Sequence, residues 1–242
     1  MAQNQTSPSA QPQPEQGQAP KRLHKYTWEK IDVTYDAARC IHAAECLRRL
    51  PTVFDRSKRP WVQADNESAD NVAATILACP SGALHYTRKD GGEAEAIPEH
   101  NTIRLARNGP LRLRGDITIL NSAGEVILHD TRVTLCRCGA SSNKPFCDNS
   151  HRAVGFQAPS PITEPQIIVD AADGGKLTIQ TTHNGPLQIT GNFTLLNSRG
   201  DAVYQGTDEA FCRCGASSDK PFCDDSHSRI GFVAEEQPLS TP

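Results

Sequence analysis

The sequence predicts an α+β protein in which a small N-terminal domain precedes a mainly β tandem repeat. In residues 25–88, β-branched and aromatic stretches alternate with segments of helical spacing. Residues 101–156 then align without a gap with residues 177–232, at a constant offset of 76 residues, and about half of the paired positions are identical. Such a repeat indicates that one supersecondary unit is built twice.

The N-terminal domain is expected to span residues 23–88. Pro51 cannot continue a helix, so it ends the first helical segment. Ser68 and Asp70 are both suitable N-caps for the second helix. The expected order is a strand with one irregularity at 25–35, a loop that turns into a short helix at 37–50, a strand at 59–65, a helix at 68–79 and a strand at 83–88.

The repeat is expected to form two domains, at residues 100–158 and 174–236. In each copy, alternating apolar residues are interrupted by an Asn-Gly pair, Asn108-Gly109 or Asn184-Gly185, which is typical of turns between short antiparallel strands. The charged, glycine-containing stretch 88–100 is interpreted as a linker.

Composition excludes several classes of function. The net charge is -3 and no stretch has a run of Lys or Arg, so binding to nucleic acid or to an anionic membrane is not indicated. No apolar run reaches the length of a transmembrane helix. Residues 1–22 are rich in Gln, Pro, Ala and Ser and lack the apolar core of a signal peptide, so we expect a disordered tail and a cytoplasmic protein.

The cysteines predict metal sites. Disulfides are rare in the cytoplasm, yet the chain has nine Cys, and six of them lie in the segments 136–151 and 212–227. These segments read CRCGASSNKPFCDNSH and CRCGASSDKPFCDDSH, so each has the pattern C-x-C-x₈-C-x₃-H. Three thiolates and one imidazole suit both zinc and iron–sulfur clusters. The two candidate ligand sets are Cys136, Cys138, Cys147 and His151, and Cys212, Cys214, Cys223 and His227.

This spacing resembles the CDGSH motif of the NEET family, whose members bind a [2Fe–2S] cluster through three Cys and one His. The resemblance implies two [2Fe–2S] clusters. The motif glycine is replaced by Asn149 and Asp225, residue types that tolerate a left-handed backbone. NEET proteins with one motif form two-fold dimers, so the resemblance implies a monomer whose two copies pair as a NEET-type pseudo-dimer. The alternative is two separate units joined by the linker 159–166.

The other three cysteines are Cys40, Cys46 and Cys79, and Cys79 directly precedes a proline. The spacing C-x₅-C with a remote Cys-Pro resembles single-cluster ferredoxins and the divergent mono-cluster ferredoxin-like domain. Ala43 stands where those proteins have the middle Cys of the run. Three thiolates imply a [3Fe–4S] cluster, whereas a [4Fe–4S] cluster needs a fourth ligand, for which His42 and Glu45 are the nearby candidates.

Ligand type sets expectations about the chemistry. Replacing a thiolate by neutral imidazole leaves a cluster less negative and easier to reduce. A proton can also displace the imidazole, which gives a route to proton-coupled redox chemistry or to cluster release. Asp148 and Asp224 are expected to cap the short helix that follows the third cysteine. Four basic residues within the ligand segments either raise the potential further or are simply solvent-exposed: Arg137, Lys144, Arg213 and Lys220.

The sequence therefore predicts a soluble iron–sulfur protein that transfers electrons, or stores and delivers clusters, with redox or cluster-acceptor proteins as partners. No nucleophile elbow, phosphate-binding glycine loop or dinucleotide fingerprint is present, so we do not expect an enzyme. One alternative is a structural zinc protein with a protein-interaction surface. Another is an oxidoreductase that binds substrate at an open iron site in the N-terminal domain.

Overall fold

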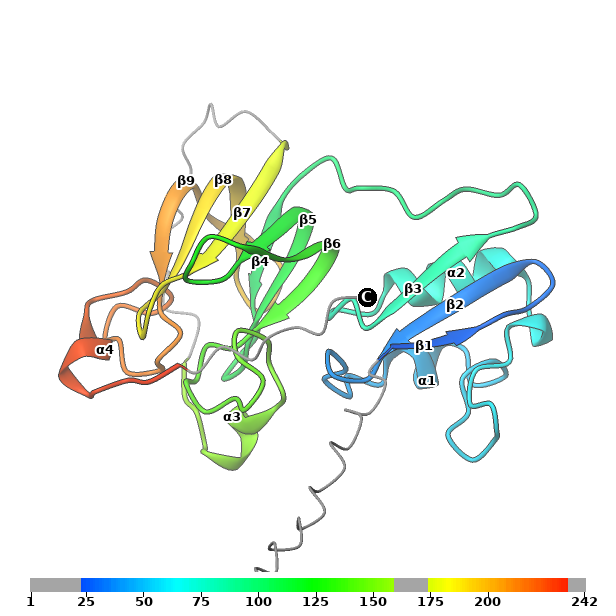
Figure 1. Cartoon of the computed structure of the whole chain (residues 1–242), viewed down its shortest axis with the longest axis horizontal. Coiled ribbons are helices and arrows are strands. Elements are labelled where there is room, and N and C mark those ends of the chain that lie inside the picture. Colours follow the sequence, from blue (N-terminus) through cyan, green and yellow to red (C-terminus); the bar gives the residue numbers. More distant parts are fainter. Residues whose placement is uncertain (1–22, 159–173, 235–242) are drawn as a thin grey trace, which may run out of the picture.

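The computed structural model describes residues 23–158 and 174–234 (Figure 1). The tail predicted at 1–22 and the last two residues of the range 174–236 lie outside the described residues, and the domain limits stay predictions. The N-terminal part is a three-stranded antiparallel sheet in the order β1-β2-β3. Its elements are β1 (Leu23–Tyr26), β2 (Ile31–Asp36), α1 (Glu45–Arg49), the 3₁₀ helix η1 (Ala64–Asn66), α2 (Ala69–Leu77) and β3 (Leu84–Arg88).

Two N-terminal predictions are wrong. The single strand predicted at 25–35 is the hairpin of β1 and β2, which reverses after Tyr26 and is held by a hydrogen bond from the Trp28 amide to Asp32 Oδ1 (3.3 Å). The strand predicted at 59–65 does not form, since Val62 makes only an isolated bridge to Phe54. Pro60 has no amide hydrogen to donate to a ladder there.

The second N-terminal helix follows its expected pattern. Of the two candidate caps, Ser68 fulfils the role: its hydroxyl accepts a hydrogen bond from the Asn71 amide (3.2 Å). The buried face of α2 includes Val72 and Ile76, which belong to the same apolar core as Val33 of β2. This core supports the loop between β2 and α1, which holds Cys40, and α1 itself, which holds Cys46.

The repeat forms one six-stranded sheet. Each copy consists of a short strand, a long hairpin and a short helix, as Figure 1 shows. The first copy comprises β4 (Thr102–Leu105), β5 (Leu111–Leu120), β6 (Val126–Leu135) and α3 (Ser150–Ala153), and the second comprises β7 (Lys176–Thr181), β8 (Leu187–Leu196), β9 (Ala202–Phe211) and α4 (Ser226–Arg229).

The two copies share strands. The first part of β5 pairs antiparallel with β4 of its own copy, and residues 116–120 pair in parallel with β7 of the other copy. In the same way β8 pairs antiparallel with β7 and, over residues 194–196, in parallel with β4. The sheet is therefore continuous across the copies, and they are not two separate units.

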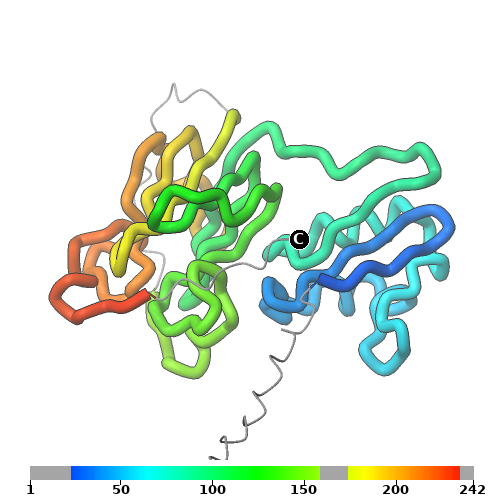
Figure 2. Tube along the Cα trace, in the orientation of Figure 1, coloured from blue at the N-terminus to red at the C-terminus, as the bar shows by residue number. Residues whose placement is uncertain are grey.

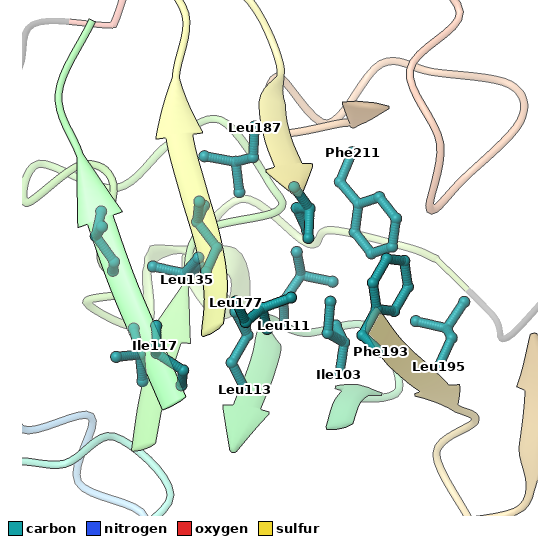
Figure 3. Packing of buried hydrophobic residues seen from close by; sticks show 14 of the residues in the cluster. Ile103, Leu111, Leu113, Ile117, Leu135, Leu177, Leu187, Phe193, Leu195 and Phe211 are labelled. Carbon is teal, nitrogen blue, oxygen red and sulfur yellow. The ribbon is translucent and has the colours of Figure 1, made fainter. Parts of the chain in front are cut away.

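One hydrophobic core serves both copies. Leu113 and Ile117 of the first copy belong to the same buried cluster as Leu177, Phe193 and Phe211 of the second (Figure 3). A unit of about 60 residues buries too small a fraction of its surface to be stable without support. Sharing the core supplies that support and holds the two ligand segments in fixed relation.

Five charged residues join the N-terminal part to the first copy, and we call them the interdomain ionic cluster: Arg39, His85, Glu95, Asp130 and Arg132. The guanidinium of Arg39 lies 2.5 Å from Asp130, and that of Arg132 lies 2.5 Å from Glu95. His85 contacts Asp130 and Glu95, at 3.1 and 3.0 Å. Burial would lower the pKa of His85, but hydrogen bonds to Asp130 and Glu95 raise it to about 9.

Within the described ranges, no helix combines the length and the hydrophobicity that crossing a membrane requires.

Substitution of Asn101 tests whether the contact between the two copies stabilises the fold. Its side-chain amide donates to the carbonyl oxygens of Gly175 (2.8 Å) and Asn192 (2.9 Å), both in the second copy, and its Oδ1 accepts from the Asp116 amide (3.0 Å). Asn101→Leu leaves these three partly buried backbone groups without their partner, so the free energy of unfolding should fall by roughly 1–3 kcal/mol. Denaturant unfolding followed by circular dichroism measures this change.

The control is Asn71→Ala in α2, which removes only an exposed side-chain hydrogen bond to Glu67 and should change stability by less than about 0.5 kcal/mol. Equal, small effects of the two substitutions would show that Asn101 does not hold the copies together.

Candidate metal centres

The first candidate ligand set lies where β6 ends. Cys136 directly follows β6 and is buried, and its amide donates to the Pro145 carbonyl oxygen (2.8 Å). The amide of Cys147 donates to the Thr134 carbonyl oxygen (3.0 Å), so the loop folds back onto the end of the strand. The short helix α3 then positions His151.

The structure arranges each set as two donor pairs. In the first set the sulfur atoms of Cys136 and Cys138 are 3.7 Å apart, and Cys147 Sγ is 3.6 Å from His151 Nδ1. The second set repeats this geometry. Its Cys212–Cys214 sulfur atoms are 3.6 Å apart, and its Cys223 Sγ and His227 Nδ1 are 3.4 Å apart.

These separations fit tetrahedral metal ions. Two sulfur donors at about 2.3 Å from one tetrahedral ion lie about 3.8 Å apart, and a sulfur and a nitrogen donor lie about 3.6 Å apart. Each pair therefore matches the two protein ligands of one metal ion. In the described part of the chain, only Cys223, Asp225 and His227 bring three donor atoms within 4.8 Å of one another. Neither Cys₃His set converges on a single point.

Hydrogen bonds set the charge on the donors. The hydrogen bond between Cys136 and Cys138 lowers the pKa of Cys136 to about 6, and nearby backbone amides act in the same direction against the effect of burial. Burial raises the pKa of Cys147 to about 11. Burial and the charge of Arg152 lower the pKa of His151, which keeps its imidazole neutral, the form that binds metals. Burial of Cys147 thus disfavours its thiolate unless a positive charge lies nearby, and a bound metal would supply that charge.

The residues in place of the motif glycine keep the turn. Asn149 has φ 74° and Asp225 has φ 61°, both in the left-handed region, as expected for these residue types. The amide of Asn149 donates to Cys147 Sγ (3.4 Å). Sequence reasoning did not predict that the carboxylate of Asp225 lies close to the donors of the second set.

Asp148 holds the ligand loop together. Its Oδ1 accepts from the amide and hydroxyl of Ser150 (2.9 and 2.6 Å), and its Oδ2 accepts from the amide and hydroxyl of Ser142 (2.9 and 2.8 Å). Burial opposes its ionisation, yet these bonds hold the pKa of Asp148 well below its usual range. The predicted contact with the helix is therefore present, but the N-cap position itself belongs to Asn149. Asp224 accepts equivalent bonds in the second copy.

The basic residues inside the ligand segments are not solvent-exposed. Arg137 is buried and donates to the carbonyl oxygens of Gly109 (2.9 Å) and Ala106 (2.8 Å), which ties the Asn-Gly turn to the ligand loop. Arg213 repeats these bonds in the second copy. Lys144 and Lys220 are half-buried and donate to backbone carbonyl oxygens of their own loops. Sequence could not reveal the burial of the two arginines, because the carbonyl groups they bind come from distant segments.

The two ligand loops lie back to back. Gly139 has φ 78°, and a Cβ atom there would lie 2.3 Å from the carbonyl oxygen of Cys214. Gly215 has φ 85°, and a Cβ atom there would lie 2.6 Å from the carbonyl oxygen of Cys138. Only glycine permits this approach, which explains the glycine that follows each C-x-C pair.

The structure also brings the three N-terminal cysteines together. Cys40, Cys46 and Cys79 line one cavity, which Ala43 lines as well. Burial, followed by the charges of Cys79 and Cys40, raises the pKa of Cys46 to about 11, so the three thiols lie close enough to affect one another. The site is thus assembled from the loop before α1, from α1 itself and from the turn that follows α2.

The two candidates for a fourth ligand differ. His42 Nδ1 lies 3.8 Å from Cys40 Sγ. The carboxylate of Glu45 is paired with Arg48 (2.6 Å) and Arg49 (3.2 Å). His42 is therefore the better placed of the two candidates.

Comparison with known proteins agrees with these sites. A family model described as an iron-binding zinc finger of CDGSH type matches residues 108–152 and 184–228, and one described as a divergent 4Fe-4S mono-cluster matches residues 26–89. The uncharacterized protein YjdI of Escherichia coli K12 is 41% identical over 64 residues, which are 26% of this chain and 84% of that protein. YjdI of Escherichia coli O157:H7 gives the same values. No solved structure matches the chain significantly.

Both resemblances inferred from the residues are thereby confirmed. The chain contains two tandem CDGSH iron-binding domains, at residues 108–152 and 184–228, that follow a divergent 4Fe-4S mono-cluster domain at residues 26–89.

Proposed function

We propose that this protein is an electron carrier with two [2Fe–2S] clusters in its Cys₃His sets and one [3Fe–4S] or [4Fe–4S] cluster at Cys40, Cys46 and Cys79. Storage and delivery of clusters in response to redox state is the second form of this proposal. The protein works in the cytoplasm as a monomer, its partners are redox or cluster-acceptor proteins, and no residue is assigned to substrate turnover.

The observation that supports the [2Fe–2S] assignment best is the division of each Cys₃His set into two donor pairs. A structural zinc ion needs all four donors around one point. A [2Fe–2S] cluster instead has two irons, each held by two protein ligands, so its donors form two separate pairs. In the first set, the two donor atoms of each pair are 3.7 and 3.6 Å apart. No three donor atoms of that set, whose residues are all described, lie within 4.8 Å of one another. This arrangement fits the cluster.

The zinc alternative has support only at the second set. There Cys223, Asp225 and His227 lie within 4.8 Å of one another and offer three ligands to one ion. Such a site would leave the close pair of Cys212 and Cys214 without a role. The cluster assignment uses all four donors of the motif, so we favour it.

The surrounding residues suit electron transfer. A bound [2Fe–2S] cluster supplies reversible one-electron chemistry. The amide of Asn149 donates to Cys147 Sγ, and that of Ala216 donates to Cys214 Sγ (both 3.4 Å), so backbone dipoles stabilise negative charge on the ligands. Burial lowers the pKa of Arg137 to about 10, which still leaves the guanidinium charged at neutral pH. Its buried positive charge favours the more negative, reduced state.

Metal content is the first test. Full-length protein purified without oxygen should be red-brown and contain iron and acid-labile sulfide in equal amounts at the two Cys₃His sets, because each donor pair binds one iron. Metal analysis and visible spectroscopy measure this. Cys147→Ser should remove the signal of one set only, and Val154→Ser, at an exposed position at the end of α3, should retain it. Stoichiometric zinc without sulfide, after expression with sufficient iron, would show that the cluster assignment is wrong.

The histidine ligands determine the potential. His151→Cys adds about one negative charge to the first cluster and should lower its reduction potential by about 100 mV or more. His227→Cys should do the same at the second cluster. A redox titration followed by EPR measures both shifts.

His129→Cys is the matched control, because His129 is an exposed histidine of β6 outside the ligand sets. It should leave both potentials unchanged. If the potentials in His151→Cys and His227→Cys also stay unchanged, histidine is not a ligand.

Substitution of Ala43 tests whether the N-terminal cluster is of the [3Fe–4S] or the [4Fe–4S] type. It lines the cavity of the three cysteines, so Ala43→Cys offers a fourth thiolate. The EPR signal of an oxidised [3Fe–4S] cluster should be replaced by that of a reducible [4Fe–4S] cluster. Ala123→Cys on an exposed turn controls for an added thiol. Three N-terminal cysteines that are all rapidly alkylated in the folded holoprotein would contradict a cluster at this site.

A further inference from the structure

The two ligand segments, 136–151 and 212–227, differ at only two of their sixteen positions. Asn143 corresponds to Asp219, and Asn149 corresponds to Asp225. The two asparagines are half-buried, whereas the two aspartates are exposed. Both differences exchange a side chain that can donate a hydrogen bond for one that, when ionised, can only accept.

Both asparagines use this ability on the N-terminal cysteine loop. Asn143 Nδ2 donates to the carbonyl oxygen of Ala38 (2.8 Å), and Asn149 Nδ2 donates to that of Ile41. These carbonyl groups lie on either side of Cys40. A carboxylate at either position would face a carbonyl oxygen and repel it. The first ligand segment is therefore adapted to the N-terminal loop, and the second is not.

The contact through Asn149 links one candidate ligand to another. Ile41 is bonded directly to Cys40, and its carbonyl oxygen accepts from the side chain of Asn149. The backbone amide of Asn149 donates to Cys147 Sγ (3.4 Å). Two hydrogen bonds and a short stretch of covalent bonds thus connect the N-terminal site to the first Cys₃His site.

Two other observations place the N-terminal site against the first copy. A cavity of about 350 Å³ is lined by Ile41 and Ala43 from the N-terminal loop and by His151 from the first ligand set. Arg132 of the interdomain ionic cluster donates to the carbonyl oxygen of Cys79 (3.2 Å). The N-terminal site therefore faces the first copy across the cavity and is hydrogen-bonded to it at Cys79.

The second site lies apart from this contact. In Figures 1 and 2, α3 lies between α4 and the three-stranded sheet, and α4 is at the end of the molecule away from that sheet. The second ligand segment bonds within its own copy: Arg213 donates to the carbonyl oxygens of Gly185 and Thr182, and Ser218 donates to Asp224. Asn143 and Asn149, by contrast, both donate to another domain.

We propose that the N-terminal cluster and the first CDGSH cluster are an internal redox pair, connected through Asn149, and that the second CDGSH cluster is not the partner of the N-terminal cluster. One electron leaves the reduced member of the pair, which is oxidised, and enters the other, which is reduced, with no bond made or broken. This inference rests on the proposed electron-transfer function.

The experiment exchanges the residues between the copies in full-length holoprotein. Asn143→Asp with Asn149→Asp gives the first copy the residues of the second, and Asp219→Asn with Asp225→Asn is the matched reverse pair. Asp225 already occupies the left-handed position, so the first pair of substitutions should retain the fold and the iron content. A flash-activated one-electron photoreductant delivers electrons, and optical spectroscopy follows their redistribution.

Wild-type protein should show a first-order redistribution phase whose rate is independent of protein concentration. The first pair of substitutions should abolish this phase and increase hydrogen–deuterium exchange in residues 38–46, and the reverse pair should change neither. Normal redistribution in the first pair despite increased exchange in 38–46, or equal loss in both pairs, would overturn the internal redox pair. Clusters that reduce without any first-order phase would overturn it as well. The absence of any reducible cluster would instead overturn the proposed function on which it rests.

Discussion

The shared core of the two CDGSH copies is the constraint on which the rest of the structure depends. Neither copy completes its sheet alone, because β5 takes β7 and β8 takes β4 as a parallel partner. Since the hairpins are locked in this register, the ligand loops at their ends must meet. Gly139 and Gly215 allow that meeting, with each backbone packed against the cysteine of the other copy. The distance between the two Cys₃His sites is therefore set by strand pairing and not by the loops.

The contact between the N-terminal domain and the first copy depends on charge and hydrogen bonding. Arg39 and Asp130 are almost fully buried, and their paired atoms are 2.5 Å apart. A buried ion pair contributes little net stability, because desolvation offsets the attraction, but losing one partner is costly. Arg132 also donates to the Leu84 carbonyl oxygen (2.9 Å). Such directional bonds favour one relative orientation of the domains, which is what a fixed path between two sites needs.

Sequence patterns predicted what local chemistry controls. The alternation and the Asn-Gly pairs gave the hairpins of the repeat, and the C-x-C-x₈-C-x₃-H spacing gave donors that the structure does bring together. The predictions were incomplete at two interruptions of the N-terminal strands and at one contact between segments that lie far apart in the sequence. The turn after Tyr26 splits one apolar run into two strands, and Pro60 prevents another run from joining the sheet. The pattern left open whether Arg137 is exposed, because its acceptors, near Gly109, lie far away in the sequence.

The asymmetry between the copies extends from hydrogen bonding to electrostatics. Near the first site, the cavity beside His151 is lined by Arg107, Arg112 and Arg152. The corresponding positions of the second copy hold His183, Gln188 and Ser228. Two asparagines of the first segment are replaced by carboxylates in the second. Positive charge stabilises a reduced cluster and negative charge opposes it, although solvent screens the exposed groups. Under the proposed electron-transfer function, the asparagines that join the first site to the N-terminal loop therefore also favour an electron there over the second site, and contact and charge then favour the same site.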